Sequence, residues 1–165
     1  GKALARVRMR GFEGRSVHQL SAGQQQKVAI AGALAAGPRV LILDEATAML
    51  DPASASEVLA IVDELNGQGV TVVSITHRMA EVVGAGRAIV LAEGQVAADG
   101  PPAEVLRSER LEQWRLSAPP VVGLAHALER ELGAGGGALS PAFTISVEGL
   151  ADALLAGAAG GGGRG

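Results

Sequence analysis

The sequence predicts an α/β fold whose sheet is mainly parallel and carries an antiparallel edge. Two short apolar runs, residues 40–43 and 70–76, are typical of strands that are buried on both faces of a parallel sheet. A helical pattern over residues 54–65 lies between them, and this alternation of strand and helix indicates the fold class. Residues 87–92 and 95–98 flank a Glu-Gly pair, which predicts a hairpin with a tight turn.

Composition limits the classes of function. Hydrophobic residues make up 48% of the 165 residues but aromatic residues only 2%, so a core must be built from Ala, Val, Leu and Ile. The net charge of -3 provides no basic field for a nucleic acid, and a bound nucleotide would depend on backbone N–H groups, a helix terminus or a metal. The absence of cysteine excludes disulfides and thiolate metal sites, and no apolar run is long enough to span a bilayer.

Helical segments are predicted along most of the chain. They are expected at residues 2–10, 24–36, 54–65, 79–83, 103–107, 111–116, 121–132 and 146–155. We divide the chain into an α/β part, residues 1–107, a helical extension, residues 108–155, and a Gly/Ala tail, residues 156–165, that is expected to be disordered. In the extension, Ser146 is a candidate N-cap with Glu148 in the first turn of its helix.

Two acids, Asp44 and Glu45, directly follow the first predicted strand. Unpaired carboxylates are costly beside a core, and at the carboxyl end of a parallel strand they face the crevice where such folds bind ligands. Asp44 is placed to hold Mg²⁺, directly or through a water, and Glu45 to polarise an attacking water as general base. For the isolated pair, an ordinary turn cap is the alternative.

The segment Leu20-Ser21-Ala22-Gly23-Gln24 opens a predicted helix. The backbone N–H groups of Ser21 and Gly23 and the positive end of the helix are expected to face outward together, which makes an anion site without basic side chains. The alternative is an ordinary N-cap, because Ser-x-Gly before a helix is common.

Two further residues have both a structural and a functional interpretation. His77 ends a predicted strand, where a neutral imidazole could donate a hydrogen bond to a phosphate oxygen and orient an attacking water; a core or turn histidine is the alternative. Asp51 precedes Pro52 and is by default the cap of the next helix.

In combination, LSAGQQQ, LILDEATAMLD and ITH stand in an order that resembles the ATP-binding subunits of ABC transporters, from Arg10 to about Val105. The resemblance implies the C-terminal portion of a P-loop NTPase fold. It makes Leu20–Gln24 the signature motif, closes the Walker B strand with Asp44 and Glu45, assigns Asp51 to the D-loop, and makes His77 the switch histidine. It also implies ATP and Mg²⁺ as cofactors.

The tail is similar to one branch of this family, the energy-coupling factor ATPases that serve cobalt and vitamin uptake. Residues 119–133 and 144–155 resemble the continuation of that branch, in which the tail helps two ATPase subunits to pair. For Leu124, Leu128 and Leu132, a helix packed on its own domain is the alternative. The resemblance implies a second ATPase subunit, a transmembrane coupling protein and a substrate-binding membrane subunit as partners, at the cytoplasmic face of the membrane.

The sequence departs from the family pattern in two ways. Ala22 stands where the signature usually has Gly, which would cost on the order of 1 kcal/mol if that position needed a positive φ. The phosphate-loop pattern G-x-x-x-x-G-K-[ST] does not occur in residues 1–165. We therefore expect a truncated form of a complete ATPase that does not turn over ATP alone.

Three functions follow as hypotheses from these features. The first is an ATPase subunit that drives uptake of a vitamin or metal ion. The second is an ABC ATPase without a transport role, acting on ribosomes or in DNA repair, against which stand the missing second cassette and basic patch. The third is an inactive fragment that serves only as an interaction module.

Overall fold

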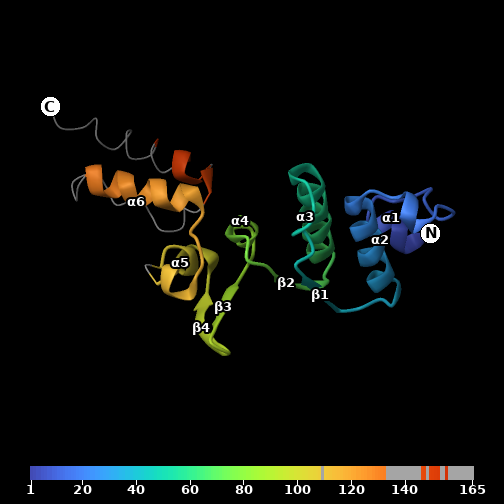
Figure 1. The fold of residues 1–165 in the computed structure, drawn as a ribbon, viewed down its shortest axis with the longest axis horizontal. Coiled ribbons are helices and arrows are strands. Elements are labelled where there is room, and N and C mark those ends of the chain that lie inside the picture. The colour runs from blue at the N-terminus through green and yellow to red at the C-terminus, as the bar shows by residue number, and fades with distance from the viewer. Residues whose placement is uncertain (109, 133–145, 148, 153–154, 156–165) are drawn as a thin grey trace. The chain divides into compact units, whose positions relative to one another are not determined.

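The structure is a computed structural model that describes residues 1–108, 110–132, 146–147, 149–152 and 155 (Figure 1). The chain forms two compact units, Gly1–Thr76 and His77–Gly165, and each is described by itself.

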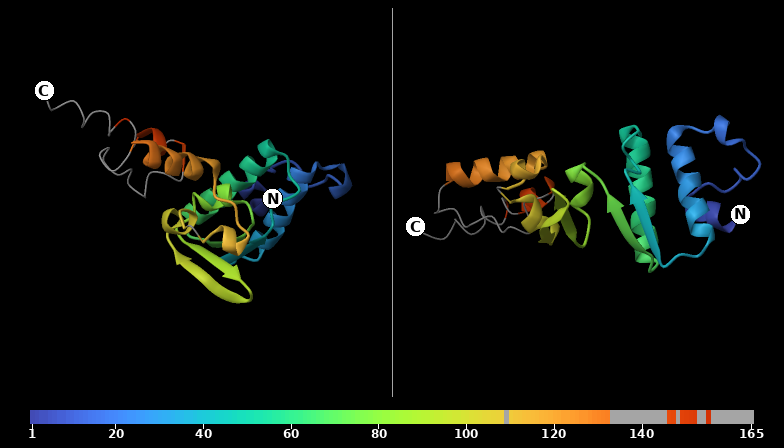
Figure 2. Two further views of the ribbon diagram at one scale, coloured as in Figure 1. Left: turned by 60° about the vertical axis from the view of Figure 1, so that its left-hand side comes forward. Right: turned by 60° about the horizontal axis from the view of Figure 1, so that its bottom comes forward.

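The first unit contains a parallel strand–helix–strand motif preceded by two helices. Its elements are α1 (Lys2–Arg6), a 3₁₀ turn (Val17–Gln19), α2 (Ala22–Ala35), β1 (Val40–Asp44), α3 (Pro52–Gly67) and β2 (Thr71–Ile75). Strands β1 and β2 pair in parallel, with Leu41 opposite Val72 and Asp44 opposite Ile75. Helix α2 contacts both α1 and α3, and it lies between them in the right-hand view of Figure 2. The predicted α/β fold with parallel strands is confirmed for this unit.

The core of this unit lies between α2, α3 and one face of the two strands. Apolar residues recur at helical spacing on α2 and α3, which turns one stripe of each helix inward. The buried set from these elements is Ile30, Ala31, Leu34, Leu41, Leu43, Val58, Ile61 and Leu65. The side chains of Ile61 and Leu65 are 0% exposed.

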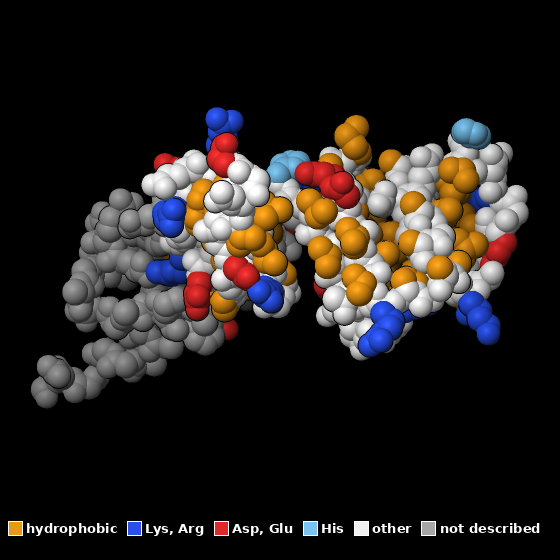
Figure 3. Space-filling view, turned by 90° about the horizontal axis from the view of Figure 1, so that it is seen from below, with side chains coloured by type: hydrophobic (Ala, Val, Ile, Leu, Met, Phe, Trp, Pro, Cys, Tyr) orange, Lys and Arg blue, Asp and Glu red, His pale blue; other side chains and the backbone are white. Residues whose placement is uncertain are grey.

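The expectation that both strands are buried on both faces is wrong. Val40 and Ile42 of β1 are 52% and 65% exposed, and Val73 and Ile75 of β2 are 46% and 50% exposed. These side chains share one face, because neighbouring residues in a strand alternate and the pairing is in register. The helices of this unit pack on the opposite face, and none of its described elements covers this one. Apolar side chains are accordingly visible at the unit's surface in Figure 3.

The first helix is shorter than the predicted residues 2–10. Val7 and Met9 are both buried, 0% and 2% exposed, although residues two apart point to different sides of a helix. The chain therefore leaves the helix after Arg6 and turns, with Arg8 at φ 59° and the Met9 N–H donating to the Leu4 carbonyl at 2.8 Å.

The second unit is built on a β-hairpin. Its elements are α4 (Met79–Val82), β3 (Ala88–Ala92), β4 (Gln95–Gly100), α5 (Pro102–Leu106), a 3₁₀ turn (Glu112–Trp114) and α6 (Pro120–Leu132). The predicted tight turn is confirmed, because Glu93 and Gly94 both have positive φ, 51° and 74°. The Arg87 guanidinium donates two hydrogen bonds to Asp99 across the hairpin, at 2.7 and 2.6 Å.

The helix of the predicted extension, α6, has buried and exposed apolar residues. Val122 and Ala125 of α6 are 0% exposed, whereas Leu124 is 53% exposed. The side chain of Leu132 lies outside the described residues, so its two predicted roles stay open. Ser146 is confirmed as an N-cap, since its hydroxyl accepts from the Gly149 N–H at 3.0 Å. Glu148 and the tail at 156–165 are outside the described residues.

Among the described residues, none of the helices has both the length and the apolar character that crossing a membrane requires.

Candidate functional site

The predicted signature segment forms the capped N-terminus of α2. The Ser21 hydroxyl accepts from the Gln24 N–H at 3.3 Å, and the Gln24 side chain accepts from the Ser21 N–H at 3.1 Å. This reciprocal capping box fixes the start of the helix, and buried Leu20, 8% exposed, anchors the residue before it. Ser21 is thus an N-cap, while the helix has no acceptor of its own for the N–H groups of Ala22 and Gly23.

Ala22 and Gly23 differ in their surroundings. Ala22 is exposed and is the first residue of α2, and it is not among the residues with positive φ, so the alanine carries no backbone strain. Gly23 is buried, because it faces α3. A Cβ atom at Gly23 would lie 2.8 Å from the Ser54 side chain, closer than real Cβ atoms approach.

The two acids leave β1 in different ways. Asp44 is the last residue of the strand and is exposed on the same face as Ile42. Glu45 adopts a left-handed conformation, φ 49°, which is unfavourable for a residue with a Cβ. Its N–H donates to the Ile75 carbonyl of β2 at 2.9 Å, which holds this conformation at the end of the sheet. Strained backbone of this kind is common at functional sites.

A hollow of about 360 Å³ brings the acid Glu45 next to the start of α2. Its lining comes from α2 and from the loop after β1. The lining residues are Ala22, Gln25, Gln26, Ala29, Glu45, Ala46, Met49 and Leu50. Ala22 of one sequence motif and Glu45 of the other, 23 positions apart, therefore share one surface of the first unit.

Asp51 is confirmed as the cap of α3. Its carboxylate accepts from the Ser54 N–H at 3.0 Å, and the hydroxyl and N–H of Ser54 hold the pKa of Asp51 below its ordinary value. His77 is exposed and is the first residue of the second unit, two positions beyond the end of β2. The site described here is built by the first unit alone.

Sequence reasoning missed an ion pair that joins α2 to α3. The Lys27 ammonium lies 2.5 Å from Glu57, with the Lys27 side chain 11% and the Glu57 side chain 58% exposed. The hydrogen bond from Lys27 and the positive charge of Lys27 both lower the pKa of Glu57. A lysine among the apolar residues of α2, four positions after Gly23, was the available signal, because a buried lysine requires a partner.

The acids that end β1 could contribute to a Mg²⁺ site. The described residues hold no group of three or more His, Cys, Asp and Glu side chains that could bind a metal ion. Asp44 nevertheless offers an exposed carboxylate, and Mg²⁺ is commonly bound by one or two carboxylates together with substrate phosphates and waters. Asp44 therefore has the donor chemistry that Mg²⁺ takes, as one ligand among others.

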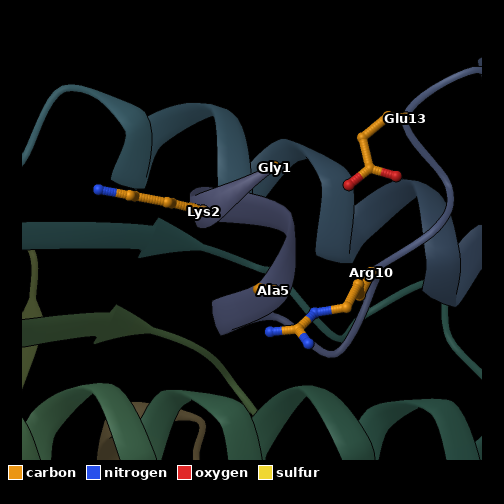
Figure 4. A pocket seen from close by; sticks show the side chains of 5 residues that line it. All are labelled: Gly1, Lys2, Ala5, Arg10 and Glu13. Atoms are coloured by element: carbon orange, nitrogen blue, oxygen red, sulfur yellow. The ribbon is translucent and has the colours of Figure 1, made fainter.

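A second hollow, of about 410 Å³, lies beside α1 and contains none of the predicted site residues. Its lining is Gly1, Lys2, Ala5, Arg10 and Glu13, shown in Figure 4.

Comparison with known proteins finds relatives that share a single description. The sequence profile of the ABC transporter family matches residues 1–48, which include LSAGQ and both acids. The energy-coupling factor transporter ATP-binding protein EcfA1 of Symbiobacterium thermophilum is 46% identical over 155 residues, which is 93% of this chain and 52% of that protein. EcfA1 of Caldanaerobacter subterraneus is 47% identical over 131 residues, 78% of this chain and 47% of its own length.

Solved structures show the same likeness. One is the structure of cbiO1 from Clostridium perfringens, described as part of the ABC transporter complex cbiONQ. Its sequence is 36% identical and its TM-score is 0.62, and the match covers 76% of this chain and 51% of cbiO1. The ADP conformation of the ATP-binding cassette MJ1267 is 28% identical with a TM-score of 0.65, over 69% of this chain and 47% of the cassette.

Fold and sequence together place the chain among the ATP-binding domains of ABC transporters. Within that class it is a homologue of the energy-coupling factor transporter ATP-binding proteins. The chain spans about half the length of the curated relatives that it matches.

Proposed function

We propose that the protein carrying this chain is an ATP-hydrolysing subunit of an energy-coupling factor importer, which couples hydrolysis to uptake of a vitamin or metal ion. The observation that carries the proposal is the shared hollow, in which Glu45 lies beside the N-terminal turn of α2. The identity of 46% with a transporter ATP-binding protein, over 93% of the chain, supports the transport role.

In this proposal the acids serve hydrolysis. Glu45 accepts a proton from the attacking water as general base, and Asp44 holds Mg²⁺. When bound, Mg²⁺ neutralises charge on the phosphates. His77 donates a hydrogen bond to a phosphate oxygen and so positions the phosphate for the attacking water.

The signature segment acts on nucleotide held by a second subunit. The segment consists of Leu20, Ser21, Ala22, Gly23 and Gln24. The N–H groups of Leu20, Ser21 and Gln24 donate within the chain, so the N–H groups of Ala22 and Gly23, at the positive end of a 14-residue helix, are the ones that suit an anionic phosphate. Asp51 completes this surface as the D-loop acid.

The proposed assembly is a pair of ATPase subunits on the cytoplasmic face of the membrane. They would work with a transmembrane coupling protein and a substrate-binding membrane subunit. The description of cbiO1 as part of a transporter complex supports such partners. The net charge of -3 gives no overall positive field to attract nucleic acid. Copurification with ribosomes instead of membrane proteins would contradict the assembly.

The test of Glu45 needs a chain in which this sequence follows a phosphate loop, because the pattern G-x-x-x-x-G-K-[ST] does not occur in residues 1–165. Glu45→Gln removes the base and keeps the size, so turnover should fall about 10²–10⁴-fold while ATP stays bound. Glu13→Gln, at the hollow beside α1, is the matched control and should keep wild-type turnover. Unchanged turnover in Glu45→Gln would contradict the role of Glu45.

The chain of residues 1–165 provides an independent test. Isothermal titration with Mg-ATP should detect no tight binding, because the phosphate loop and its lysine supply much of the nucleotide affinity in this class. Tight binding would show that other residues of this chain hold the nucleotide.

A further inference from the structure

Helix α2 comes close to α3 at Gly23, which lies against Ser54. A Cβ atom built on Gly23 would lie 2.8 Å from both the Cβ and the Oγ of Ser54, and 3.8 Å from its Cα. By contrast, Gly32, also in α2, has nothing within 4 Å of such an atom. The absence of a side chain at position 23 therefore allows the two helices to meet here.

Ser54 also contacts the other motif. Its N–H donates to the Asp51 carboxylate at 3.0 Å, and its hydroxyl hydrogen-bonds to the same carboxylate and lowers its pKa. The Ser54 side chain thus lies between the signature helix and the acid that caps α3. One serine joins two segments that are 28 positions apart in sequence, Gly23 and Asp51.

A second contact fixes the register of the two helices. Lys27 follows Gly23 by four residues on α2, and Glu57 follows Ser54 by three residues on α3, so each pair shares a helix face. The Lys27 ammonium reaches Glu57 at 2.5 Å with its side chain only 11% exposed. Two contacts one turn apart prevent α2 from sliding or rotating freely on α3.

We propose that Ser54 is a positioning residue, which holds the signature end of α2 and the Asp51 cap of α3 as one rigid unit. This inference rests on the proposed function for its catalytic consequence, but its structural basis is independent of ATP. It also gives Gly23 a role in helix packing, separate from any contact that its N–H makes with phosphate.

The test is a set of paired substitutions in the chain of residues 1–165, followed by thermal and urea unfolding. Gly23→Ala should lower the folding equilibrium constant about tenfold or more, because the added methyl overlaps Ser54. Adding Ser54→Gly removes the overlapping atoms and should return the double variant to within about threefold of Ser54→Gly alone. Adding Ser54→Ala should give no rescue, because the Cβ at 2.8 Å remains.

Gly32→Ala is the matched control in the same helix. The space around it is open, so alanine should raise the folding equilibrium constant a few-fold through its better helix propensity. Equal losses in Gly23→Ala with and without Ser54→Gly would overturn the packing contact.

Two further readouts test positioning beyond stability. Carboxyl NMR of Ser54→Ala should show the pKa of Asp51 rising toward its ordinary value, and an unchanged pKa would contradict the serine link. In the longer chain with a phosphate loop, Ser54→Gly should lower ATP turnover, and Gly23→Ala/Ser54→Gly should regain stability but not turnover, because both variants lack the side chain that positions the two segments. Wild-type turnover in a folded Ser54→Gly variant would overturn positioning and leave the proposed function standing. An inactive parent would instead refute the proposed function while the unfolding results still stand.

Discussion

The left-handed backbone at Glu45 leads to a prediction that separates conformation from chemistry. Residues with a Cβ pay about 1–2 kcal/mol in this region, and glycine does not. Glycine also makes the unfolded chain more flexible, which costs about 0.4–1 kcal/mol of stability. We expect Glu45→Gly to be about 0.5–1 kcal/mol more stable than Glu45→Ala.

The comparison of these two variants isolates the backbone. Both lack the carboxylate and every contact that it makes, and both keep the N–H that donates to Ile75 at 2.9 Å. For a domain of this size the expected difference is roughly 1–4 °C in the unfolding temperature. It can be measured by circular dichroism, with amide hydrogen exchange in α3 reporting on the first unit.

At Ala48, a change to glycine should lower stability instead of raising it. Ala48 is exposed and is not among the residues with positive φ, so Ala48→Gly should lose about 0.4–1 kcal/mol. If Glu45→Gly proved less stable than Glu45→Ala, position 45 would not be left-handed in solution and the strain assigned to it would be wrong. All three variants at Glu45, to Gln, Ala and Gly, should be equally poor in hydrolysis.

Three other predictions follow from local contacts. Ser21→Ala removes the hydroxyl that accepts from the first turn of α2 and should cost about 1 kcal/mol in urea unfolding. Ile61→Ala, at a side chain that is 0% exposed, should cost about 2–5 kcal/mol, whereas Ile42→Ala, 65% exposed, should cost well under half of that. Because Lys27 lowers the pKa of Glu57, stability from this pair is complete above about pH 4.3 and is lost as the pH falls below it.

Each of these has a direct check. Ser16 precedes a 3₁₀ turn without a side-chain cap bond, so Ser16→Ala should leave stability nearly unchanged. An equal loss for Ile42→Ala would show that the exposed face of the strands is covered in solution. Lys27→Met should flatten the fall of the unfolding temperature between about pH 5 and 3, and an unchanged slope would exclude the ion pair as its source.

Local sequence patterns predicted most of the individual elements. The run before Asp44 and the helix after Asp51 were recognised because strand and helix periodicity and capping depend on neighbouring residues. The hairpin turn at Glu93-Gly94 was equally clear, since few residue pairs accept two positive φ angles. The helix at the N-terminus was overestimated, because the burial of Val7 and Met9 is a tertiary effect.

The candidate site was predicted in its residues but not in its geometry. The resemblance of three motifs, in their order along the chain, predicted the signature segment and the two acids. Their shared hollow depends on how α2 packs beside the loop that follows β1, which no local pattern encodes. The left-handed conformation of Glu45 likewise depends on a hydrogen bond to the neighbouring strand.

By itself, the sequence determined the class of this protein, its order of strands and helices, and the caps at Ser21 and Asp51. These depend on short-range hydrogen bonds and periodicity, which act over a few residues. Only the tertiary structure decided that Gly23 packs on Ser54, that Lys27 pairs with Glu57, and that one face of the strands stays exposed. Those outcomes depend on which surfaces meet when distant segments fold together, and side-chain contact between helices is specified by shape rather than by sequence distance.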